Sequence, residues 1–298
     1  MSRSSTAART YLAFVLLWIA AMLVAAIASP WVHMLIAPLV HKPLPRLFDR
    51  LMMPGLIVGT AWLIRNQSQR LQLLGFNPGL SHFLRRVLLG LLFGALLMLV
   101  ALVPLLLWKV RVLNERVPTE MAGWMLLAAK GLASGIAVAV LEETFFRGAM
   151  QGSLQRIGAA RWAIFGVPLL YSAVHFLGHM GPMSFDPVNA WSGFDVWRND
   201  FHLFGEPLRI LDAFVALYMV GLLLALVRQR WGDISGCIGL HAGFVAVIAV
   251  FHHISVPASD ARWSFLIGTF DGLLGWWVAA LAATTCAGLW YAGRIRTA

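Results

Sequence analysis

The sequence predicts an all-α protein, a polytopic transmembrane helical bundle of about eight spans. Three observations lead to this fold class: 60% of the 298 residues are hydrophobic, only 12% are charged, and the mean hydropathy is +0.77. A soluble domain is about 45–50% apolar and about 25% charged, so the composition excludes a water-soluble globule and a disordered chain. No repeat, linker or low-complexity tract divides the chain, so we expect a single transmembrane domain over residues 1–298.

A membrane span requires about 20 mostly apolar residues, and eight stretches approach this requirement. In chain order they cover residues 11–29, 47–64, 87–108, 121–141, 162–177, 211–227, 234–254 and 265–291. The second is the weakest because it contains Asp49, Arg50 and Pro54. The fourth continues into Glu142-Glu143, a polar turn at 155–161 follows it, and an acidic loop at 178–207 follows the fifth.

The charges of the chain favour a membrane surface as its partner. The formal net charge is +10, from 23 basic and 13 acidic residues, and the arginines stand singly or in pairs between apolar runs. This distribution is typical of loops that face anionic lipid, and it does not resemble a nucleic-acid patch. We therefore expect an integral protein of the bacterial inner (cytoplasmic) membrane with both termini cytoplasmic. Cys237 and Cys286 are far apart and predict neither a disulfide framework nor a zinc site.

Ionisable residues inside a span are costly, so each one is a candidate for function. The strongest candidates are Glu142 and Glu143, which stand five and four residues before Arg147 at the end of the fourth stretch. Residues four apart share a helix face, so Glu143 and Arg147 should pair, while Glu142 faces elsewhere. A carboxylate in an apolar wall without its own cation suits a general acid or base.

Two histidines are expected at the depth of Glu142. If the polar turn forms a helical hairpin, Glu142 and His175 lie at equal distances from its centre and hence at equal depth. With alternating topology, His241 in the seventh stretch enters from the same side. These residues predict a buried site of one carboxylate and two imidazoles, although buried histidines that bond to carbonyl groups would also explain them.

The motifs resemble those of the CPBP family, the CAAX proteases and bacteriocin-processing proteins, which is also called the abortive-infection family and includes the Ras-converting enzyme. The resemblance rests on Glu142-Glu143-x-x-x-Arg147, Tyr171-x-x-x-His175 and His241-x-x-x-Val245, and covers roughly residues 121–254. Two positions depart from the family pattern: Tyr171 stands where Phe is usual, and Val245 stands where many members have Asn.

The resemblance implies an intramembrane endopeptidase that acts on a membrane-associated peptide or protein. Glu142 and His175 would activate water, and His241 would donate a hydrogen bond to the oxyanion. Glu143 and Arg147 would orient Glu142, with Tyr171 as a further supporting residue. We favour this glutamate mechanism without a cofactor; in the alternative, Glu142, His175 and His241 would bind zinc.

Other functions stay open from the sequence. A non-catalytic scaffold or immunity protein would keep the same fold with a purely structural polar cluster. A proton-coupled transporter ranks last, because no paired repeats with matching Gly/Pro-broken helices are present. The sequence also lacks a His-Glu-x-x-His zinc helix, a pair of intramembrane aspartates and a Gly-rich phosphate loop.

Overall fold

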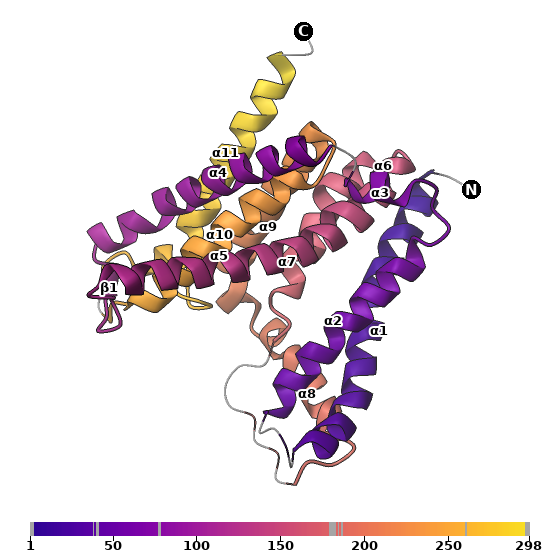
Figure 1. Cartoon of the computed structure of the whole chain (residues 1–298), viewed down its shortest axis with the longest axis horizontal. Coiled ribbons are helices and arrows are strands. Elements are labelled where there is room, and N and C mark those ends of the chain that lie inside the picture. The colour runs from indigo at the N-terminus through magenta and orange to yellow at the C-terminus, as the bar shows by residue number, and fades with distance from the viewer. Residues whose placement is uncertain are drawn as a thin grey trace. The chain divides into compact units, whose positions relative to one another are not determined.

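The computed structural model of the chain is 78% helical and confirms the all-α class (Figure 1). It describes residues 3–37, 39, 42–76, 79–178, 183, 185, 187–259 and 261–295. These residues form two compact units. Unit 1 comprises residues 1–70 and 173–208, and unit 2 comprises residues 71–172 and 209–298.

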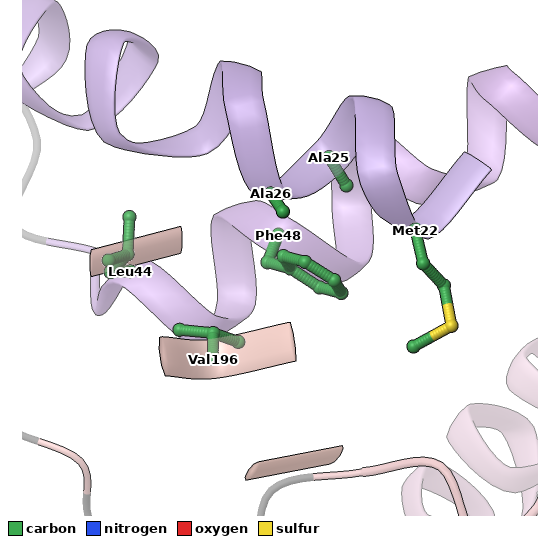
Figure 2. Packing of buried hydrophobic residues seen from close by; sticks show 6 residues of the cluster. All are labelled: Met22, Ala25, Ala26, Leu44, Phe48 and Val196. Atoms are coloured by element: carbon green, nitrogen blue, oxygen red, sulfur yellow. The ribbon is translucent and has the colours of Figure 1, made fainter. Parts of the chain in front are cut away.

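Unit 1 is built on two long helices, α1 (Arg3–Ile36) and α2 (Leu44–Leu63), with the short helix α8 (Ser192–Asp200) and the 3-10 turn η3 (His202–Gly205). Small residues let the helices approach closely: an ideal Cβ on Gly193 of α8 would lie 2.0 Å from the Ala26 carbonyl oxygen of α1. Figure 2 shows the buried apolar cluster at this contact, in which Met22, Ala26, Phe48 and Val196 contribute from all three helices. The acidic loop predicted at 178–207 therefore contains a packed helix.

Unit 2 contains the remaining long helices: α4 (Leu80–Leu107), α5 (Met121–Glu143), α9 (Pro207–Trp231), α10 (Ser235–Ile254) and α11 (Trp276–Ile295). The helix α5 continues as the π-helix η1 (Thr144–Met150) and then as α6 (Gln151–Arg156). After a turn, the π-helix η2 (Trp162–Gly166) leads into α7 (Val167–Val174). The short elements are α3 (Arg70–Leu74), η4 (Ser264–Leu266) and the antiparallel pair β1 (Arg111–Leu113) and β2 (Ser255–Pro257).

The centre of unit 2 is α10, which packs against both α4 and α5 (Figure 1). Glycines spaced four residues apart make these contacts close. An ideal Cβ on Gly135 of α5 would lie 2.6 Å from the Ala242 carbonyl oxygen, and one on Gly239 of α10 would lie 2.0 Å from the Val87 carbonyl oxygen. Close backbone approach through small residues is the usual way in which membrane helices associate.

This packing predicts that Gly239→Ala destabilises the protein, because the added methyl group must displace a backbone carbonyl group of α4. Overpacking of this kind costs about 1–3 kcal/mol, and thermal unfolding in detergent should show it as a lower midpoint. The matched control is Gly288→Ala in α11, where a Cβ would meet nothing within 4 Å. Equal unfolding midpoints for the two variants would contradict the close packing of α10.

Five helices are long and apolar enough to cross a membrane in the described part of the chain. They are 4–36, α4, the continuous helix 121–156, α9 and α10, while the fifth predicted stretch forms a shorter apolar helix over 162–174. The chain is therefore an integral membrane protein, and the expected number of eight spans stays a prediction. Helices occupy the other two predicted positions as well, in α2 and α11.

The last predicted stretch, 265–291, was wrong at its beginning, because α11 starts only at Trp276. Gly268 and Gly272 have positive φ angles of 61° and 68°, which interrupt a helix. Between them, Asp271 Oδ1 accepts hydrogen bonds from the backbone N–H groups of Leu273 and Leu274. Burial raises the pKa of the Asp271 carboxyl group above its ordinary value, and these two hydrogen bonds oppose the shift. The segment is thus an ordered loop.

Candidate active site

One face of α5 brings a carboxylate to the centre of unit 2. Gly131, Gly135, Ala139 and Glu143 follow one another at intervals of four residues and are the buried residues of this helix. Ideal Cβ atoms on the two glycines would lie 2.9 Å and 2.6 Å from carbonyl oxygens of α10. Since residues four apart share a helix face, the stripe that packs on α10 also directs Glu143 toward that helix.

The predicted pair of Glu143 and Arg147 is confirmed. Arg147 Nη1 lies 3.1 Å from Glu143 Oε1, and both side chains are fully buried. A second N–H group of Arg147, at Nη2, donates to the Gly221 carbonyl oxygen of α9 at 3.1 Å. Buried charges are tolerated when they are paired and hydrogen-bonded, and both conditions hold here. The pair therefore ties the end of α5 to α9.

His241 binds the same carboxylate from α10. Its Nδ1 lies 2.8 Å from Glu143 Oε1, and the residue is 4% exposed. An ionised carboxylate only accepts hydrogen bonds, so Nδ1 must be the donor. Nε2 is therefore the ring nitrogen that is available for chemistry. It carries a lone pair when the imidazole is neutral and an N–H group when the imidazole is protonated.

Glu142 stands on the other side of the same imidazole. Its Oε2 lies 3.9 Å from His241 Nε2, and its side chain is 25% exposed whereas that of Glu143 is fully buried. The two adjacent glutamates thus differ in environment, as their 100° separation on a helix predicts. Glu143 is fully buried, whereas the Glu142 side chain is partly exposed although its Oε2 atom is buried.

The polar cluster, defined as Glu142, Glu143, Arg147 and His241, is enclosed by aromatic rings. Tyr171 of α7 is 2% exposed, and its ring meets the His241 ring edge to face at a centroid distance of 6.3 Å. The Arg147 guanidinium lies 4.4 Å from the centroid of the same tyrosine ring, a distance typical of a cation–π contact. The predicted supporting role of Tyr171 fits this position between the arginine and the histidine.

The charges of the polar cluster balance when His241 is protonated, because two cations then face two anions. With a neutral imidazole the cluster would carry one net negative charge in an apolar setting. Within the described residues, Glu143 Oε2 has no hydrogen-bond partner although it is buried. Such an oxygen is a typical position for an ordered water molecule.

His175 belongs to a different compact unit from the polar cluster. The expected helical stretch 162–177 was wrong at its end, since α7 stops at Val174 and His175 stands in the turn that follows. The N–H groups of Phe176 and Leu177 bond to carbonyl groups three residues earlier, which tightens the chain and ends the α-helix. His175 is half-buried and belongs to unit 1, and its pairing with Glu142 stays a prediction.

Glu142 Oε2 and His241 Nε2, which are 3.9 Å apart, are candidate donors for a metal ion. Zinc sites use three protein ligands of this kind with water in a fourth position. The described residues contain no group of three such side chains close enough to hold a metal ion. Glu142 and His241 are two of the three residues that the zinc alternative names, and metal binding stays untested.

Sequence reasoning missed the bond between His241 and Glu143. We expected Arg147 alone to satisfy Glu143, and the histidine to approach Glu142. The signal that could have revealed the bond is the small-residue stripe on α5, because it identifies the face against which another helix packs. Glu143 continues that stripe, and Glu142 does not.

The comparisons with known proteins concern the same region of the chain. A family model described as type II CAAX prenyl endopeptidase Rce1-like matches residues 124–247. No curated protein and no solved structure matches the chain. The matched segment begins in α5 and ends in α10, so it contains the complete polar cluster together with Tyr171 and His175. Over this segment the chain is similar to the CAAX prenyl endopeptidases, which are peptide hydrolases of the membrane, and this similarity supports the resemblance of its motifs to the CPBP family.

Proposed function

We propose that the chain is an intramembrane endopeptidase in which Glu142 activates a water molecule for attack on a peptide bond. The observation that carries this proposal is the position of His241 between two glutamates, 2.8 Å from one and 3.9 Å from the other. Glu143 is bound by Arg147 and fully buried, whereas Glu142 is partly exposed. A structural cluster would not require this second, costly carboxylate.

Glu142 is proposed as the general base. A base must come within hydrogen-bond reach of the water that it deprotonates, and its partial exposure allows this. His175 is proposed as its partner, on the basis of the family motif and its half-buried position after α7. The proton taken from water would then pass to the leaving amine of the substrate, which completes hydrolysis without a covalent intermediate.

His241 is proposed to stabilise the oxyanion through Nε2. Because Nδ1 donates to Glu143, Nε2 can donate only when the ring is protonated, and the charge balance of the polar cluster supports that state. Glu143 and Arg147 would act as positioning residues that fix the ring. Val245, one turn after His241, offers no hydrogen-bond donor, so in this proposal His241 carries that role without the Asn found in many family members.

The substrate is a peptide or protein segment presented at or within the membrane. A comparison of membrane and secreted proteins from cells that carry wild type or Glu142→Gln tests this function. We expect uncleaved forms of a few proteins to accumulate in the variant. Identical protein patterns would favour the non-catalytic scaffold.

The choice between a glutamate and a zinc mechanism has its own prediction. We expect the purified protein to carry no stoichiometric metal and to keep its activity after treatment with a strong chelator, since the proposed water activation needs no metal. Elemental analysis and peptide hydrolysis measure these two properties. One zinc ion per chain that is lost in His241→Ala, together with chelator-sensitive activity, would replace the glutamate mechanism by the metal mechanism.

A further inference from the structure

A groove on unit 2 lies apart from the polar cluster. It has a volume of about 430 Å³, within the range of about 300–1,000 Å³ that is typical of small-molecule sites. Residues of η2 and α7, the residue that precedes them and one residue of α9 line it: Arg161, Trp162, Phe165, Gly166, Leu169 and Tyr218. Large apolar side chains of the lining are exposed, with Phe165 and Leu169 each 48% exposed. None of these residues takes part in the proposed hydrolysis.

The groove follows from the local sequence. Trp162 lies three and four positions before Phe165 and Gly166, and Leu169 lies four and three positions after them. These lining residues therefore share one helix face. Gly166 has no side chain, so an open strip of surface, which we call the lane, runs between Trp162, Phe165 and Leu169. From Arg161 to Leu169 the lane extends over nine residues. Only its first residue is charged.

That charged end lies at a basic end of unit 2. Gln155 Nε2 is 3.3 Å from Gln229 Oε1, so the end of α6 and the end of α9 lie together, and Arg161 follows α6 after a short turn. Arg156, Arg161 and Arg230 are exposed in this region. Asp233, the acidic residue that follows α9, is already bound by Arg86 and Ser235. The charged residue that lines the groove, Arg161, is therefore a cation at a basic end of unit 2.

We propose that this groove binds one anionic phospholipid, with its phosphate on Arg161 and one acyl chain along Trp162, Phe165 and Leu169. The groove lies on apolar helices of an integral membrane protein, so hydrocarbon is the medium that reaches it. A positive entrance with an apolar lane complements a negative headgroup with an acyl chain. Trp162 beside Arg161 is typical of the headgroup level of a membrane.

Other occupants fit this surface less well. A peptide strand in the groove would place unsatisfied backbone N–H and C=O groups in the hydrocarbon region, which costs several kcal/mol per group. A second copy of the chain would pack best on a face of small residues, whereas Trp162, Phe165 and Leu169 are large. An acyl chain has no polar groups and adapts to an irregular apolar surface.

Native mass spectrometry of the purified chain, titrated separately with phosphatidylglycerol and phosphatidylcholine, tests this proposal. We expect phosphatidylglycerol to bind more tightly, and Arg161→Gln to weaken its binding about fivefold, the size of effect of one basic residue near an anionic surface. The matched control is Arg262→Gln, which removes the same charge from another Arg-Trp dipeptide, where the guanidinium lies 5.3 Å from the Trp263 ring centroid. This control should bind phosphatidylglycerol as wild type does.

Two further variants test the acyl part of the groove. Gly166→Leu adds a side chain to the lane and should weaken phosphatidylglycerol binding. Leu169→Trp also fills the lane and should weaken phosphatidylglycerol binding in the same way. Because Leu169 is exposed, this variant serves as the test if Gly166→Leu fails to fold. The proposal would be overturned if the two lipids bound equally, or if Arg161→Gln and Arg262→Gln weakened phosphatidylglycerol binding equally. Displacement of the lipid by inorganic phosphate, or formation of a dimer that excludes lipid, would also overturn it.

Discussion

Replacing Glu142 by Gln should lower the rate of peptide hydrolysis by about 10²–10⁴-fold, the usual contribution of a general base. The amide keeps the size of the side chain but cannot accept a proton from water. Because the Glu142 side chain is partly exposed whereas that of Glu143 is fully buried, the unfolding midpoint should stay near that of wild type. Single-turnover hydrolysis and thermal unfolding in detergent measure the two properties.

The matched control for this variant is Glu120→Gln. Glu120 is exposed and directly precedes α5, so the change removes the same charge at a distance from the polar cluster. We expect wild-type activity and wild-type stability. If the unfolding midpoint of Glu142→Gln is as low as that of Glu143→Gln, its loss of activity would be caused by loss of folding stability. The proposed division of roles between the two glutamates would then be wrong.

Replacing Glu143 by Gln should destabilise the protein by about 3–5 kcal/mol, the cost of leaving a buried ion without its partner. Arg147 would lose the anion that lies 3.1 Å from its Nη1, and His241 would lose the carboxylate that accepts a hydrogen bond from its Nδ1 at 2.8 Å. Activity should fall as well, because Nε2 of His241 would no longer be oriented. Chemical unfolding in detergent measures the loss of stability.

A double variant separates this explanation from a general intolerance of substitution. Glu143→Gln combined with Arg147→Met removes both charges, and a buried pair replaced by neutral residues is often tolerated. The double variant should therefore be more stable than Glu143→Gln alone. Equal or greater destabilisation in the double variant would show that the pair does not act as a mutually compensating unit.

The sequence alone predicted the elements that depend on local composition. Apolar length located the helices, and spacing of four residues located the Glu143–Arg147 pair, because both are properties of a single helix. Stretch ends were less predictable. The end of α7 before His175 depends on a local turn, and the late start of α11 depends on Gly268, Gly272 and an aspartate between them.

The bond between His241 and Glu143 could not be predicted from spacing, because it joins residues 98 positions apart. It depends on the rotation of α10 relative to α5, which glycine contacts determine. Once Gly131, Gly135 and Ala139 are recognised as the contact face, the next residue on that face is Glu143. The expectation that Glu142 faces another direction is consistent with the same rotation, while its proposed partnership with His175 stays a prediction.

Cleavage by the purified chain tests the central claim most directly. Wild type, Glu142→Gln and Glu120→Gln would each be reconstituted into lipid vesicles with a membrane peptide identified from the cellular comparison, and mass spectrometry would record the new peptide termini. We expect wild type and Glu120→Gln to produce the same two fragments, whose masses sum to that of the peptide plus one water, and Glu142→Gln to produce neither at a comparable time. Fragments formed at equal rates by all three proteins would contradict the assignment of Glu142 as the residue that activates water.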